Sequence, residues 1–138
     1  MTLSLSEILE RCSKLSSNKE KVAFLQSNRS GPLYTILKFA YDPRIVWALP
    51  EGAPPYTPCD LPDQEARLLQ EARRLYLFTS SGNPDMHPLR RETLFVQLLE
   101  SIDPADAKLV LSIKDKKIPY KGITAKLVEE AFPGLIDS

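Results

Sequence analysis

The chain has 138 residues, of which 18 are basic (Lys or Arg) and 18 are acidic, so its formal net charge at pH 7 is zero. Its 43% hydrophobic and 26% charged residues exclude a disordered chain, and no apolar run approaches the roughly 18 residues that would cross a bilayer. A strong attraction of the whole molecule to DNA or to anionic membranes is also excluded, so nucleic-acid binding would require local charge separation.

Helix-capping signals divide the first third of the chain into three predicted helices. Ser4 or Ser6 can cap the first, and Asn18 can cap the second, because the side chains of these residues accept hydrogen bonds from unsatisfied N–H groups. Pro32 suits the first turn of the third helix, where its missing N–H costs nothing. Asp42-Pro43 ends this helix.

A proline-rich loop follows, with five prolines between residues 50 and 62. Proline at this density is incompatible with a helix or a central strand. The loop therefore divides a single domain (residues 1–138) into two helical halves, residues 1–49 and 63–138. Asp63 is expected to cap a long helix that continues to Phe78.

The last third of the chain contains three further helix starts. His87-Pro88 and Asp103-Pro104 each precede a stretch of apolar residues at helical spacing, and Thr124 opens a short final helix that Pro133-Gly134 ends. No convincing pair of alternating strands is present. The predicted fold is all-α, a compact bundle of six or seven helices.

The strongest candidate binding site is a basic turn before the last helix. Helix N-termini present unsatisfied N–H groups and a partial positive charge that attract phosphate. We expect the backbone of Gly122, Ile123 and Thr124, with the Thr124 hydroxyl, to bind a nucleic-acid phosphate. The positive charge at this turn comes from four lysines, Lys116, Lys117, Lys121 and Lys126.

Two Arg pairs form a second basic surface, Arg73-Arg74 and Arg90-Arg91. One member of each pair is expected to bond a nearby carboxylate, and partners three or four residues away are the best placed. Phosphate binding by these arginines is the alternative. The lysines of the basic turn also have an alternative interpretation, as solvated residues of a surface loop.

The remaining reactive side chains do not assemble into a catalytic or metal site. Cys12 and Cys59 lack metal-ligand spacing and His87 is the only histidine, so no metal or cofactor is expected. Reduced thiols are the preferred state of the cysteines, although a disulfide stays open. Asp103 and Asp106 are interpreted as a helix cap and a first-turn acid. We expect no enzyme activity, no small-molecule substrate and no membrane partner.

Three motifs in order resemble the N-terminal helical DNA-binding domain of ATP-dependent DNA ligases of T-even-type phages. The first is the Lys-rich stretch 17–28 with Tyr41-Asp42-Pro43 after it, the second is the turn and helix at 122–128, and the third is Phe-Pro-Gly-Leu-Ile at 132–136. The resemblance covers most of the chain. It implies a stand-alone phage protein of that family, located in the cytoplasm of the host cell.

The chain departs from the ligases where their chemistry is carried out. The ligases take up AMP on the lysine of a Lys-x-Asp-Gly motif, and this chain has no such motif. Its Lys114-Asp115 pair lacks both the intervening residue and the glycine. The resemblance therefore implies a non-catalytic module that binds the backbone of duplex DNA without sequence specificity, as an accessory to replication or repair. The alternative is a module that binds a host or phage protein.

Overall fold

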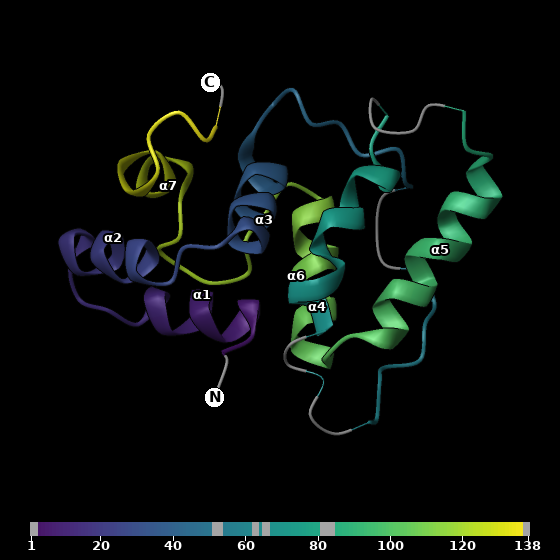
Figure 1. Cartoon of the computed structure of the whole chain (residues 1–138), viewed down its shortest axis with the longest axis horizontal. Helices are drawn as coiled ribbons and strands as arrows, with labels where there is room; N and C mark the ends of the chain where they lie inside the picture. The colour runs from purple at the N-terminus through teal and green to yellow at the C-terminus, as the bar shows by residue number, and fades with distance from the viewer. Residues whose placement is uncertain (1–2, 51–53, 62–63, 65–66, 81–84, 137–138) are drawn as a thin grey trace.

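The computed structural model describes residues 3–50, 54–61, 64, 67–80 and 85–136. Within these residues the protein is all-α, as predicted, and the only β pairing is an isolated bridge between Trp47 and Thr79. Seven α-helices and one 3₁₀ helix, η1, follow one another along the chain (Figure 1): α1 (Leu5–Ser13), α2 (Asn18–Ser27), α3 (Gly31–Tyr41), α4 (Arg67–Glu71), η1 (Ala72–Phe78), α5 (Pro88–Ser101), α6 (Pro104–Lys114) and α7 (Ala125–Ala131).

The first three helices begin with serine caps. The Ser4 hydroxyl accepts a hydrogen bond from the Glu7 N–H, so the prediction for α1 is confirmed. The cap of α2 is Ser17, one residue before the predicted Asn18, because the Ser17 hydroxyl accepts from Glu20 N–H. Ser30 caps α3, and a proline occupies the first turn as expected.

The helix starts of the last third are confirmed. His87 Nδ1 accepts from Leu89 N–H at 3.1 Å, Asp103 Oδ2 from Ala105 N–H at 3.0 Å, and Thr124 Oγ1 from Leu127 N–H at 3.1 Å. These short-range bonds satisfy donors that the helix itself cannot pair.

The predicted long helix before residue 78 is replaced by α4 and η1. Its buried residues explain the change, because Ala72, Leu75 and Phe78 recur every three residues. This spacing aligns side chains along one edge of a 3₁₀ helix but not of an α-helix. The expected cap, Asp63, lies outside the described residues.

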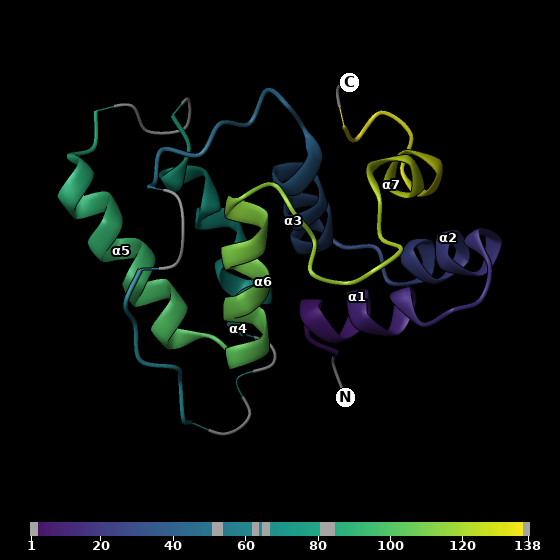
Figure 2. The same ribbon diagram turned by 180° about the vertical axis from the view of Figure 1, so that it is seen from behind.

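The helices share one hydrophobic core. In both views α1, α2 and α7 lie at one end, α5 lies at the other, and α3, α4 and α6 lie between them (Figures 1 and 2). α3 packs on α6, α6 on α5, and α7 on α2, and every helix contributes to a single cluster of buried apolar side chains. The chain after α6 therefore returns to the N-terminal end of the molecule.

The segment between α3 and the proline-rich loop runs beside the end of η1. Ala48 N–H donates to Phe78 O and Ser80 N–H donates to Val46 O, both at 2.8 Å. The Trp47 ring packs edge-on against Phe39 of α3, with 5.8 Å between ring centroids. These contacts hold an extended segment next to the C-terminal ends of α3 and α6.

Candidate nucleic-acid interface

The predicted basic turn lies in the segment that connects α6 to α7. Gly122 has a φ of +89°, a conformation that glycine adopts readily and other residues avoid. A Cβ at this position would lie 2.6 Å from Lys21 Nζ. Glycine therefore permits both the turn and the close approach of a lysine from α2.

Lys21 also lies at this turn, although it was not among the site residues predicted from the sequence. It lies 100 positions before Lys121 in the sequence, and the packing of α7 on α2 brings the two together. The Gln26 side chain fixes this packing by donating to Ala131 O at 2.9 Å. The only signal in the sequence was the Lys-rich start of α2, which belongs to the first ligase-like motif.

Three of the four predicted lysines are exposed on this segment and on α7. None of the ion pairs between described residues includes Lys117, Lys121 or Lys126, and none includes Lys21. No carboxylate of the described residues therefore pairs with these ammonium groups. We call Lys21, Lys117, Lys121 and Lys126 the lysine cluster.

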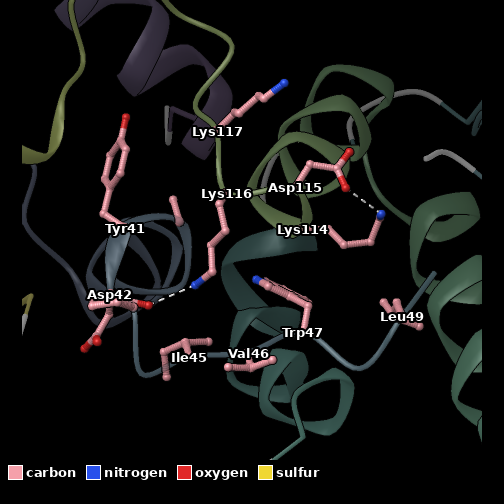
Figure 3. Close-up of a pocket in the computed structure, with 12 residues that line it drawn as sticks. Tyr41, Asp42, Ile45, Val46, Trp47, Leu49, Lys114, Asp115, Lys116 and Lys117 are labelled. Atoms are coloured by element: carbon pink, nitrogen blue, oxygen red, sulfur yellow. Dashed lines mark hydrogen bonds and ion pairs between the residues drawn. The ribbon is translucent and has the colours of Figure 1, made fainter. Parts of the chain in front are cut away.

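Lys116 points into the protein and does not belong to this cluster. Its Nζ donates to Asp42 O at 2.9 Å and to Phe39 O at 3.0 Å, at the C-terminal end of α3 (Figure 3). Burial lowers the pKa of Lys116, and the nearby Asp42 carboxylate opposes this shift. Lys116 has a positive φ of 62°, which directs its side chain back across α3. Its role in this fold is to cap the carbonyl end of α3.

The backbone part of the predicted phosphate site is also engaged within the protein. Ile123 N–H donates to Tyr120 O at 3.4 Å, and Ile123 O accepts from the Tyr41 hydroxyl at 2.6 Å. The Ile123 side chain is buried, and the Thr124 hydroxyl caps its own helix. Helix α7 has only seven residues. The candidate interface is therefore made of lysine side chains rather than of a helix N-terminus.

One member of the first Arg pair bonds a carboxylate, as expected, whereas the bond of Arg91 in the second pair goes to a backbone carbonyl. Arg74 pairs with Glu71 at 3.4 Å, an i,i+3 pair on the surface. Arg91 is buried, and its Nη2 donates to Met86 O at 3.2 Å. Arg73 and Arg90 are exposed on η1 and α5, outside the segment between α6 and α7 and outside α7 itself. They do not extend the lysine cluster.

Replacing Gly122 by Ala is expected to destabilise the protein by about 1 kcal/mol, because the new Cβ makes the positive φ unfavourable. The same Cβ displaces the Lys21 ammonium, which can move because it ends a flexible side chain. Chemical denaturation measures the loss. Gly31→Ala is the matched control, since nothing lies within 4 Å of its Cβ position and its φ is not positive. Equal stability of the two variants would contradict the expectation.

The described residues contain no group of three His, Cys, Asp or Glu side chains that would hold a metal ion. Cys12 is buried and Cys59 is half-buried, and both are free thiols. No described helix is long and apolar enough to cross a membrane.

The chain belongs to a family of unknown function, DUF6433, whose model matches residues 8–120. No curated protein matches the chain. Of the lysine cluster, Lys21 and Lys117 lie within the matched stretch, while Lys121 and Lys126 follow it.

Proposed function

We propose that this DUF6433 protein is a non-catalytic module that binds the phosphate backbone of duplex DNA through the lysine cluster. The observation that carries the proposal is the approach of Lys21 of α2 to Gly122, in a stretch that also carries the exposed Lys117, Lys121 and Lys126. None of the four lysines is in an ion pair among the described residues. In a chain of zero net charge, this is the local charge separation that phosphate binding requires.

Lysine contacts of this kind give binding without sequence specificity, because they reach phosphates and not base edges. The expected role is therefore to position the protein on a duplex, as an accessory to replication or repair in the cytoplasm of a phage-infected cell. The resemblance of three sequence motifs to a ligase DNA-binding domain supports this role. Membership of the ligase family itself stays a prediction.

Binding to nicked and intact duplex DNA, measured by fluorescence anisotropy across a range of salt concentrations, tests the proposal. Affinity should fall with salt, and each lysine that contacts phosphate should contribute about 0.9 to the slope of log affinity against log salt. Combining Lys21→Ala, Lys117→Ala, Lys121→Ala and Lys126→Ala should lower the slope by about 3 to 4 units and the affinity at least about a hundredfold at low salt.

Lys108→Ala provides a charge-matched control for each single substitution, because Lys108 is exposed on α6 outside the cluster. It should change the slope by less than any cluster lysine does. Affinity that is independent of salt, or that survives loss of all four cluster lysines, would rule out the proposed interface.

A second candidate function, protein binding, has its own supporting observation. Leu89 is 67% exposed at the start of α5, beside a groove of about 810 Å³ lined by Pro54, Pro55 and Val96. Glu92 also lines this groove, and no described basic side chain forms an ion pair with it. The matching partner is an apolar protein segment flanked by basic residues.

Affinity capture from nuclease-treated lysate separates this candidate from DNA binding. A stoichiometric protein that is lost with Leu89→Asp, but retained with Leu61→Asp and with the four-lysine variant, would favour the second candidate. Leu61 serves as the control because it is equally exposed, at 64%, and does not line the groove.

A further inference from the structure

A second groove, of about 930 Å³, lies between the C-terminal ends of α3 and α6 and the extended segment 45–49 (Figure 3). One wall is apolar, formed by Ile45, Val46 and Trp47. The opposite wall is cationic and carries Lys114, Lys116 and Lys117. The volume of the groove falls in the range of small-molecule sites, which combine apolar surface with a few polar groups.

Two of these lysines have incompletely satisfied ammonium groups. Lys114 has a side chain only 2% exposed, and its Nζ donates to Pro50 O and to Asp115 Oδ1, both at 2.9 Å. Lys116 Nζ has two acceptors as well, Phe39 O and Asp42 O. Because an ammonium group carries three donors, each lysine keeps one N–H without an acceptor among the described residues. An acceptor atom supplied by a ligand would satisfy the remaining donor of Lys116, whereas the buried Lys114 points away from it, toward Asp115 (Figure 3).

The charge balance of the groove favours an anionic ligand. Asp42 and Asp115 are the carboxylates that line it, and both are already paired with cations. Asp42 Oδ2 lies 3.5 Å from Arg44 Nη2 and 3.9 Å from Lys38 Nζ, while Asp115 pairs with Lys114. Because other cations already pair with both carboxylates, the charge of Lys116 is left in excess in the groove.

The walls of the groove are fixed before any ligand arrives. Lys116 and the Trp47 indole N–H share Phe39 O as an acceptor, and Lys114 holds the chain at Pro50. The same two ammonium groups thus anchor the apolar wall, and Lys116 keeps one donor for a ligand. Preorganisation of this kind reduces the entropy that binding costs.

We propose that this groove binds a small organic anion, with its carboxylate or phosphate at Lys116 and its apolar part against Val46 and Trp47. This goes beyond DNA binding by the lysine cluster. It also departs from the expectation, based on sequence, that the protein has no small-molecule substrate. The sequence places the three lysines close together but does not reveal the facing apolar wall.

Trp47 is the only tryptophan of the chain, so its fluorescence reports on the groove directly. The probes are phenylacetate and phenyl phosphate, which separate carboxylate from phosphate as the preferred group, with phenylacetamide as the neutral analogue. At least one anion should cause a saturable change at millimolar concentration, and the amide should bind about tenfold more weakly or not at all. The indole N–H signal of Trp47 in a ¹H–¹⁵N NMR spectrum should move with the same dissociation constant.

Charge substitutions at the rim test the location without disturbing the core. Val46 is 55% exposed, so Val46→Glu should weaken anion binding about tenfold, whereas Val46→Lys should retain or tighten it. Leu61→Glu makes the same change in net charge at a site that does not line the groove, and it should leave binding unchanged.

The proposal is overturned if neither anion produces a saturable change in Trp47 fluorescence and in its N–H signal. Equal binding of phenylacetamide, or equal weakening by Val46→Glu and Leu61→Glu, also overturns it. Lys117 lines this groove and also belongs to the lysine cluster, but the substitutions at Val46 and Leu61 leave it in place. Each outcome therefore leaves the DNA-binding proposal to be decided by its own experiment.

Discussion

Replacing Asp106 by Asn is expected to stabilise the protein by about 2 kcal/mol at pH 7 and to lose this advantage at about pH 4. Asp106 is completely buried between α6 and the start of α1. Its Oδ1 accepts a hydrogen bond from Ser6 N–H at 3.0 Å, but no described donor reaches its Oδ2. The ionised carboxylate is therefore incompletely solvated by the protein.

Burial raises the pKa of Asp106 from 3.8 to about 6. The nearby Asp103 and Glu7 carboxylates raise it further, while hydrogen bonds from the side chain and backbone of Ser6 lower it. Tyr120 lies in the same environment, and burial raises the pKa of its phenol as well. The charged groups that act on Asp106 are thus acidic, and they favour its protonated form.

The pH dependence follows from the sign of this shift. Since the folded-state pKa lies above the unfolded-state pKa, the folded protein binds more protons between about pH 4 and pH 6. The free energy of unfolding therefore rises as the pH falls through this window. The full shift corresponds to about 3 kcal/mol, at 1.36 kcal/mol for each pKa unit, and an Asn amide without an acceptor at the Oδ2 position removes part of the gain.

Urea denaturation of the wild type and the Asn variant at several pH values measures the difference directly. Subtracting the two curves removes the titration of all other carboxylates. Asp60→Asn, which removes an exposed carboxylate, should follow the wild-type profile. A difference between wild type and Asp106→Asn that stays constant from pH 4 to pH 7 would contradict the assignment.

Asp106 also illustrates where prediction from the sequence ends. Its place in the first turn of α6 was predicted correctly from local spacing, since the Asp103 cap and Pro104 define where the helix begins. The burial of Asp106 was not predicted, because its contact with Ser6 joins residues 100 positions apart in the sequence. Helix periodicity identifies a residue's face but not the helix that covers it.

In the candidate site, too, some features were predicted from the sequence and others were not. Gly122 was recognised as a turn residue, and Lys117, Lys121 and Lys126 lie exposed near it. Lys116 is adjacent to Lys117 in the sequence, yet its positive φ turns its side chain onto α3. Neighbouring lysines look equivalent in a charge count, and only the path of the backbone separates the capping lysine from the solvent-exposed one.

The docking of α7 is the long-range feature on which the lysine cluster depends. Phe132 follows α7, is 9% exposed, and packs edge-on against Tyr34 of α3 with 4.9 Å between ring centroids. The Tyr41 hydroxyl bond to Ile123 O and the Gln26 bond to Ala131 O secure the two ends of the same region. Loss of the Phe132 ring removes the aromatic contact between this region and α3.

Phe132→Ala is therefore expected to lower the free energy of unfolding by about 3 kcal/mol, because it deletes a buried aromatic side chain and leaves a cavity. Phe132→Leu, which retains most of the apolar volume, should lose only about 1 kcal/mol. Guanidinium denaturation measures both values. A loss below 1 kcal/mol for the Ala variant would contradict the tight packing of Phe132 on α3.

Hydrogen exchange distinguishes global from local destabilisation by Phe132→Ala. Because α7 shares the single hydrophobic cluster with every other helix, protection should fall throughout the core and not only in α7. If exchange accelerates in α7 alone, this helix is a separately opening unit. In that case the proposed DNA binding should weaken in the folded variant as well, because α7, which carries Lys126, would no longer be held against α2.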